Sequence, residues 1–268
     1  NPSNYKKKDF LFYLEDLQAR ILIVKSGDET SAREAAEALG VPVLELTSCA
    51  AGNGGFELTG KAKALSGTGG YAEAGDIALV LHTSGTTSKP KRVPLTHSNL
   101  CVSADNIVKT TGLTSDDGCL NVMPLFHIHG LVACVLASLF GGGHTVCTTG
   151  FAADQFYGWL NEFKPSWYSA VPTMHQAILA KGKKEDFGKT SLRFIRSSSA
   201  ALPPSVMKGL EDLFSVPVIE SYGMTEAAHQ MASNPLPPLE RKPGSVGIAA
   251  GPEVSILNDA NEQLASGQ

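Results

Sequence analysis

The most informative segment of this chain is LVLHTSGTTSKPKRVP, residues 79–94. It begins with apolar residues typical of a buried strand and continues into hydroxyl residues, a glycine and lysines. A loop at the carboxyl end of a strand exposes successive backbone N–H groups, which can hold phosphate oxygens together with hydroxyls and a lysine. Gly85 permits close backbone approach, and Pro90 stiffens the arm that presents Lys91. The segment therefore predicts a phosphate-binding loop.

Several common sites do not fit the sequence. Gly85 and Lys91 have the spacing of a Walker A loop, but Pro90 and Arg92 stand where that loop has its second glycine and its Ser or Thr. No G-x-G-x-x-G occurs at a predicted strand-to-helix turn, which argues against a dinucleotide fold. No G-x-S-x-G occurs either, which argues against a serine hydrolase.

Strand and helix patterns alternate on both sides of this segment. Short apolar runs predict strands at 21–24, 43–46, 77–81, 119–123, 145–147, 167–171, 194–195 and 216–219. Helical periodicity predicts helices at 7–17, 30–39, 98–108, 131–140, 153–163, 173–179 and 205–213. This alternation indicates an α/β fold of mostly parallel sheets flanked by helices.

Changes of composition divide the chain into three parts. Residues 1–75 are expected to form an α/β subdomain that ends in a Gly-, Ala- and Ser-rich linker, and residues 76–234 a larger α/β core. Residues 235–268 are rich in proline before the apolar run Val254–Leu257, which we interpret as the start of a β-rich subdomain. Because the chain lacks an initial methionine and stops just after an expected strand, we expect a piece of a longer protein.

Composition narrows the class of protein. The 268 residues are 43% hydrophobic and 18% charged, which excludes a disordered chain. A formal net charge of −4 argues against nucleic-acid binding, which depends on Lys and Arg neutralising phosphates. No apolar run is long enough for a membrane span. The five cysteines are scattered without C-x-x-C spacing, so we expect reduced thiols and a cytoplasmic location.

Four ordered motifs resemble those of the adenylate-forming, or AMP-binding, superfamily, which includes acyl-CoA synthetases. The phosphate loop is similar to its [ST]-S-G-[ST]-T-G-x-P-K-G signature, with Ser88 and Arg92 replacing two glycines. MPLFHIHG at 123–130 is similar to its P-x-F-H-x-x-G block, and SYGMTE at 221–226 to its Y-G-x-T-E block. Residues 197–202 lie where the superfamily has its adenine-flanking segment.

The resemblance implies the large N-terminal domain of these enzymes and a two-step reaction. With Mg²⁺, ATP and a carboxylic acid give an acyl-adenylate, and coenzyme A then takes the acyl group as a thioester. It also implies that the phosphates contact Thr83, Ser84, Gly85, Thr86, Thr87 and Lys91. The rest of the nucleotide would contact Ser199, Ala200, Ala201, Ser221, Tyr222, Gly223, Met224 and Thr225, with Tyr222 stacked on adenine. The expected catalytic residues are Lys91, Thr225 and the Mg²⁺ ligand Glu226.

Among these enzymes, the chain most resembles plant and fungal oxalate–CoA ligases, through WYSAVPTMHQ at 167–176, LRFIRS at 192–197 and EAAHQM at 226–231. A second carboxylate in the acid pocket needs hydrogen-bond donors or positive charge to offset its desolvation. We therefore expect the small acid at His127, Ser197 and His229. A ligase for another acid, such as 4-coumarate or a fatty acid, and a degenerate nucleotide-binding module remain alternatives.

Two further expectations concern metal and completeness. His127 and His129 form an H-x-H pair with Cys134 and His144 nearby, but no third ligand has typical zinc spacing. In the superfamily, a ribose-binding Asp and a small domain with the adenylation lysine would follow residue 268, so we expect this piece alone to be inactive. The full-length protein could be peroxisomal, and the sequence leaves the oligomeric state open.

Overall fold

A computed structural model describes residues 5–49, 55–61, 70–83, 90–182, 190–265 and 267 of the chain. The chain forms two compact units, residues 1–71 and residues 72–268. Among the described residues, no helix combines the length and the apolar character that a membrane crossing requires. The three-part division predicted from composition stays a prediction.

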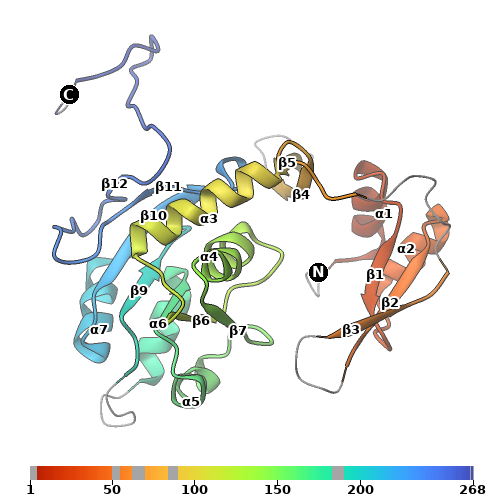
Figure 1. Cartoon of the computed structure of the whole chain (residues 1–268), viewed down its shortest axis with the longest axis horizontal. Coiled ribbons are helices and arrows are strands. Elements are labelled where there is room, and N and C mark those ends of the chain that lie inside the picture. The colour runs from red at the N-terminus through yellow and green to blue at the C-terminus, as the bar shows by residue number, and fades with distance from the viewer. Residues whose placement is uncertain are drawn as a thin grey trace. The chain divides into compact units, whose positions relative to one another are not determined.

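The first unit is a three-stranded sheet with two helices (Figure 1). Its elements are α1 (Lys7–Asp16), β1 (Leu22–Lys25), α2 (Ser31–Leu39), β2 (Val43–Ser48) and β3 (Phe56–Thr59). β1 and β2 are parallel, so the strand–helix–strand prediction is confirmed. Gly40 ends α2 in the left-handed conformation, with φ of 66°, that glycine adopts readily. A small core forms where Leu14 meets Ala35 and Ala36.

β3 corrects the sequence prediction, which placed residues 50–75 in a loop or linker. It pairs antiparallel with β2, with Phe56 opposite Ser48 and Thr59 opposite Glu45. All four residues of β3 are exposed, so no buried apolar run marks the strand in the sequence. The strand follows from pairing with its neighbour rather than from a local hydrophobic pattern.

The second unit contains a seven-stranded sheet in the order β12-β11-β10-β9-β8-β6-β7, and a separate hairpin. Its strands are β4 (Ile77–Thr83), β5 (Lys91–Thr96), β6 (Gly118–Asn121), β7 (His144–Cys147), β8 (Trp167–Ala170), β9 (Phe194–Ser197), β10 (Val218–Met224), β11 (His229–Ser233) and β12 (Ile248–Ala249). Its helices are α3 (His97–Thr111), the π-helix η1 (His129–Leu136), α4 (Ala137–Phe140), α5 (Ala153–Phe163), α6 (Pro172–Lys181), α7 (Pro204–Phe214) and the 3-10 turn η2 (Thr225–Ala227).

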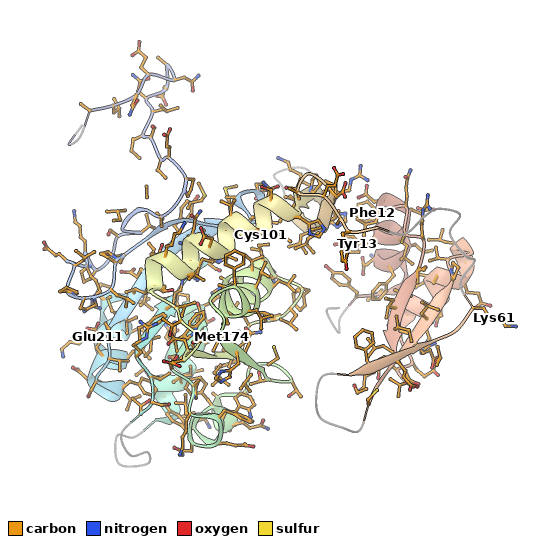
Figure 2. All side chains as sticks on the ribbon, viewed as in Figure 1. Phe12, Tyr13, Lys61, Cys101, Met174 and Glu211 are labelled. Carbon is orange, nitrogen blue, oxygen red and sulfur yellow. The ribbon has the colours of Figure 1, made fainter. Side chains whose placement is uncertain are left out.

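Five strands of this sheet, β7, β6, β8, β9 and β10, run parallel, which confirms the predicted α/β fold. Successive residues alternate between two cores: Trp167 and Phe194 stack at 5.4 Å toward α3, η1 and α4, whereas Tyr168 and Ile195 face α5, α6 and α7. Figure 1 shows α3 and α5 on opposite sides of the sheet. Met174 of α6 contacts both cores (Figure 2).

The hairpin β4–β5 corrects the position of the first strand of the core. The sequence predicts residues 77–81 as one strand of a mostly parallel sheet, but β4 pairs antiparallel with β5 in a sheet of two strands. β5 buries Val93 and Leu95 and exposes Pro94 between them. Pro94 hides this alternation in the sequence, although proline is tolerated on such an edge strand. The phosphate loop therefore connects the two strands of a hairpin.

The end of the chain also differs in detail from the prediction. β11 and β12 extend the sheet antiparallel to β10, beyond the parallel strands. The apolar run predicted as a strand at 254–257 forms only one bridge, from Leu257 to Gln263. Val254, Ile256 and Leu257 are exposed, so the run has no apolar surface to cover it within the described residues. Whether residues 235–268 begin a β-rich subdomain stays a prediction.

Candidate functional site

The two ends of the phosphate loop meet at the end of the hairpin where the loop joins β4 to β5. Thr83 of β4 lies opposite Lys91 of β5, and both flank residues 84–89. The Thr83 hydroxyl donates to the Glu226 Oε1 at 3.3 Å. The hairpin therefore places a hydroxyl and an exposed lysine beside the carboxylate of the SYGMTE segment. The predicted phosphate contacts Ser84, Gly85, Thr86 and Thr87 lie outside the described residues.

The SYGMTE segment leaves the sheet through an irregular turn. The pairing of β10 with β11 shifts register between Tyr222 and Gly223, and Thr225 begins the 3-10 turn η2. A side chain at Gly223 would overlap the carbonyl oxygen of His229, so the close approach of the strands requires glycine. As a result Tyr222 and Met224 point outward, and Tyr222 is 45% exposed. Its ring is available for stacking.

The adenine-flanking segment lies beside this turn. The Ser198 hydroxyl donates to the Ser221 carbonyl at 3.1 Å, and the Ser221 hydroxyl donates to the Ser197 carbonyl at 3.3 Å. These bonds hold the end of β9 against β10. Ser199, Ala200 and Ala201 are exposed beyond it. The structure thus brings two of the predicted nucleotide segments to one edge, where the carboxyl ends of the parallel strands meet.

The three residues predicted for the acid differ in their surroundings. His127 is exposed, with its ring 4.7 Å from that of Phe126. Ser197 is buried and its hydroxyl has no partner within the described part of the chain. His229 is buried, and its Nδ1 likewise has no partner there. In the described ranges, no hydrogen bond or ring contact joins these three residues to one another, and their role stays a prediction.

A buried polar cluster lies next to His229, and sequence reasoning missed most of it. His129 packs 5.3 Å from the His229 ring, and its Nε2 lies 2.7 Å from the Ser169 hydroxyl. The other nitrogen, Nδ1, lies 3.1 Å from the exposed Ser199 hydroxyl. Arg196 of β9 donates to the same Ser169 hydroxyl at 3.5 Å. We define the acid-site cluster as His129, Ser169, Arg196, Ser199, Gln230 and His229.

Two signals in the sequence could have identified this cluster. His129 was considered only as a zinc ligand, although a histidine at the start of an apolar helix is expected to be buried with it. Arg196 lies in the fully buried strand FIRS directly after Phe194 and Ile195, and arginine is almost never fully buried without a partner. Among the described residues, no three His, Cys, Asp or Glu side chains are grouped as they would be around a metal ion.

Burial sets the charge of the acid-site cluster. It lowers the pKa of His129 and of His229 well below 6.5, and the nearby positive charge of Arg196 lowers both further. Both imidazoles are therefore neutral at neutral pH. Burial also lowers the pKa of Arg196, from 12.5 to about 10, which leaves the guanidinium charged. The cluster thus carries one positive charge and several hydrogen-bonding groups.

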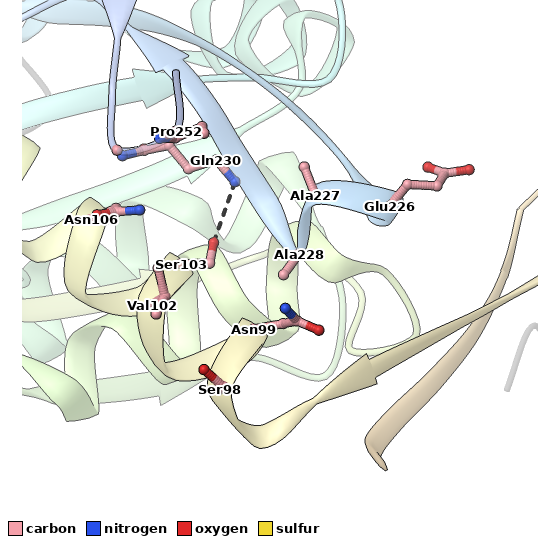
Figure 3. A pocket seen from close by; sticks show the side chains of 11 residues that line it. Ser98, Asn99, Val102, Ser103, Asn106, Glu226, Ala227, Ala228, Gln230 and Pro252 are labelled. Carbon is pink, nitrogen blue, oxygen red and sulfur yellow. Dashed lines mark hydrogen bonds between the residues drawn. The ribbon is translucent and has the colours of Figure 1, made fainter. Parts of the chain in front are cut away.

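A groove opens beside the cluster, between α3 and the segment that contains η2 and β11 (Figure 3). Its volume is about 340 Å³, and Glu226 lies at one end of its lining. The Gln230 N–H donates to the Ser103 hydroxyl of α3 at 3.4 Å, and the Gln230 side chain accepts from Arg196 at 3.3 Å. Gln230 therefore links the groove to the buried cluster.

An α/β fold with parallel strands, whose carboxyl edge carries an acidic and a basic side chain beside a buried polar cluster, is typical of nucleotide-binding proteins. Sequence comparison makes the class specific. The chain belongs to the AMP-binding enzyme family, whose profile matches residues 2–268. The resemblance drawn from the four motifs is confirmed.

Several curated relatives are identical to the chain at more than a third of the aligned positions. It is 43% identical to a probable CoA ligase, CCL9, of Humulus lupulus over 96% of the chain and 50% of that protein. It is 42% identical to an oxalate–CoA ligase of Arabidopsis thaliana, over 96% of the chain and 51% of that protein. The oxalate–CoA ligase of Saccharomyces cerevisiae is 39% identical, over 100% and 53%. The chain spans about half the length of these relatives.

Solved structures share the fold. The crystal structure of ATP-bound MatB from Rhodopseudomonas palustris superposes with a TM-score of 0.80 at 26% identity, over 99% of the chain and 52% of that protein. MenE of Bacillus subtilis, an O-succinylbenzoate coenzyme A synthetase in complex with ATP and a magnesium ion, gives 0.79 at 25% identity, over 100% and 53%. Both comparisons confirm the predicted fold class.

Proposed function

We propose that this chain is the nucleotide- and acid-binding part of an AMP-forming acid–CoA ligase, and that the acid is oxalate. The observation that carries the proposal is the meeting of the phosphate-loop ends with Glu226, next to the acid-site cluster. Identity of 39–43% to CoA ligases, two of them oxalate–CoA ligases, supports the same assignment.

In the first step, a carboxylate oxygen of the acid attacks the α-phosphorus of ATP and pyrophosphate leaves. Lys91 neutralises charge on the outer phosphates, and the Thr225 hydroxyl donates to the α-phosphate. The exposed ring of Tyr222 stacks on adenine beside Ser199 and its neighbours. These groups contribute mainly by holding the carboxylate and the phosphate in line. In the second step, the coenzyme A sulfur attacks the acyl carbon and AMP leaves.

Mg²⁺ fits the oxygen donors at this edge. The Glu226 carboxylate is exposed and lies within hydrogen-bonding distance of the Thr83 hydroxyl, and hard oxygen ligands of this kind suit Mg²⁺. Together with phosphate oxygens these two side chains would hold the ion. When bound, Mg²⁺ offsets the negative charge of the phosphates that the acid must approach.

Acid selectivity and nucleotide binding test the proposal separately. Calorimetry with an unreactive ATP analogue and Mg²⁺ should show oxalate binding more tightly than acetate, malonate or 4-coumarate. Lys91→Ala should weaken nucleotide binding by about 1–3 kcal/mol, because a charge-assisted contact is lost. Lys208→Ala is the matched control, since Lys208 pairs with Asp212 on the surface of α7.

The outcomes discriminate between the parts of the proposal. If Lys91→Ala bound the nucleotide as tightly as the original chain, Lys91 would not belong to the phosphate site. If 4-coumarate or malonate bound better than oxalate, the chain would be a ligase component for a different acid. Absence of nucleotide binding by the original chain would refute the nucleotide site itself.

A further inference from the structure

Arg196 is a fully buried arginine without a countercharge. Among the residues that the structure describes, no Asp or Glu contributes to its electrostatic surroundings. Its Nη2 donates to the Gln230 Oε1 at 3.3 Å and its Nη1 to the Ser169 hydroxyl at 3.5 Å, while its Nε has no partner there. A buried charge is costly unless it is paired, so an unpaired guanidinium calls for a ligand or partner that balances it.

The other arginine near β9 shows the ordinary arrangement. Arg193 forms an ion pair with Asp117 at 2.9 Å and donates to the carbonyls of Thr111 and Gly112. It is also partly exposed, so water shares its charge. Three positions further along, Arg196 is fully buried, and no carboxylate of the described residues pairs with it. Arg193 directly precedes β9 and Arg196 lies within it, and of these two arginines the one beside the histidines has no anionic partner among the described residues.

The hydrogen bonds around Arg196 have a defined direction. A guanidinium only donates, so the Ser169 oxygen accepts from Arg196. In the tautomer of His129 that leaves Nε2 unprotonated, the Ser169 hydroxyl donates to that nitrogen. A neutral His129 then carries its proton on Nδ1 and donates to the Ser199 oxygen. The Ser199 hydroxyl is left to donate outward. Arg196 thereby orients a chain of hydrogen-bond donors toward the exposed edge where the nucleotide is proposed to bind.

The charge of the site fits one further carboxylate. His129 and His229 are neutral, so Arg196 supplies the only positive charge of the acid-site cluster. When an acid with two carboxylates is activated, one carboxylate bonds to phosphorus and the other stays ionised. That remaining carboxylate brings one negative charge, which offsets the guanidinium. A monocarboxylic acid would leave the buried charge uncompensated.

We infer that Arg196 is the specificity-determining residue of the acid site, because its unpaired charge selects an acid whose second carboxylate remains ionised. The inference rests on the proposed function. Arg196 acts on the acid both through its field and through the orientation of His129 and Ser199, so no direct contact with the acid is required.

Oxalate and oxamate provide the test, since oxamate has the same shape with an uncharged amide in place of one carboxylate. In the original chain, with Mg²⁺ and an unreactive ATP analogue, calorimetry should show oxamate binding at least about 30-fold more weakly than oxalate. In Arg196→Met this preference should fall to within about 3-fold, mainly through weaker oxalate binding. Arg196→Lys keeps the charge and should retain part of the preference.

Arg193→Met is the matched control, because it removes an arginine of the same region whose charge is already paired. It should lower the unfolding temperature and leave the preference for oxalate unchanged. Equal binding of oxalate and oxamate by the original chain would overturn the inference even if Arg196→Met failed to fold. An unchanged preference in folded Arg196→Met would overturn it too. If the original chain bound the nucleotide but neither acid, the proposed function would fail instead.

Discussion

Ser169→Ala tests the connection between Arg196 and His129 through stability. The substitution removes one oxygen from a fully buried position and leaves the volume nearly unchanged. His129, which is 2% exposed, loses the partner of its Nε2 at 2.7 Å, and Arg196 loses the acceptor of its Nη1. An orphaned buried group costs about 1–3 kcal/mol, and the longer contact to the charged group adds about 1 kcal/mol. We therefore expect a loss of about 2–4 kcal/mol.

Equilibrium unfolding in urea at pH 7.5 measures this loss. Both tryptophans, Trp159 and Trp167, lie in the second unit, so their fluorescence reports on that unit alone. Relative to a typical stability of about 5–15 kcal/mol, the expected loss shifts the midpoint clearly. An unchanged slope would show that the same surface becomes exposed on unfolding.

Ser138→Ala is the matched control, since Ser138 is equally inaccessible and its hydroxyl donates to the Cys134 carbonyl at 2.6 Å. That carbonyl also accepts from the N–H of Ala137, so no group is orphaned and the cost should stay below about 1 kcal/mol. If Ser169→Ala cost no more than Ser138→Ala, the hydrogen-bond chain from Arg196 to His129 would not be part of the folded structure.

Two further perturbations concern buried histidines. Burial lowers the pKa of His175 to about 4, so the unfolded chain, with a pKa near 6.5, binds the proton first. The contribution of His175 to the free energy of unfolding is complete above pH 6.5, and about 3 kcal/mol is lost as the pH falls toward 4. His175→Gln should remove that part of the pH dependence of stability measured by urea unfolding. Parallel plots of stability against pH for the two proteins would contradict this. Gly223→Ala should displace His229, because a Cβ at residue 223 overlaps the His229 carbonyl oxygen. Oxalate binding measured by calorimetry should then weaken at least about 10-fold. Unaltered oxalate binding would show that acid binding does not depend on the position of His229.

The parallel part of the sheet was predictable because its strands are buried on both faces. Short apolar runs occur at Trp167 and Tyr168 of β8 and at the start of β9, and such runs are distinctive in sequence. β3 and β5 were not predictable in this way, since all of β3 is exposed and Pro94 interrupts β5. The edges of sheets depend on pairing partners that a local pattern does not contain.

The nucleotide edge could be predicted from motifs, whereas the buried cluster could not. Tyr222 and Glu226 lie within the recognisable SYGMTE motif, and the structure places Glu226 beside the end of the phosphate loop. His129 and Ser169 are 40 residues apart and meet only when η1 packs on β8. The spacing of these two residues along the chain therefore does not predict that contact. The signals that the sequence does contain are a histidine at the start of an apolar helix, His129, and the isolated charge of Arg196 within β9.

The position of His129 in the cluster depends on the number of residues in the π-helix η1. A π-turn contains one residue more than an α-turn, and His129 is the first residue of this segment. Loss of one codon between Gly130 and Leu136 would let the segment relax to an α-helix and rotate His129 by about 100° relative to the residues that follow. His129 would then turn away from Ser169. Among descendants of one ancestral gene, a single deletion can therefore change the choice of acid without replacing any polar residue of the cluster.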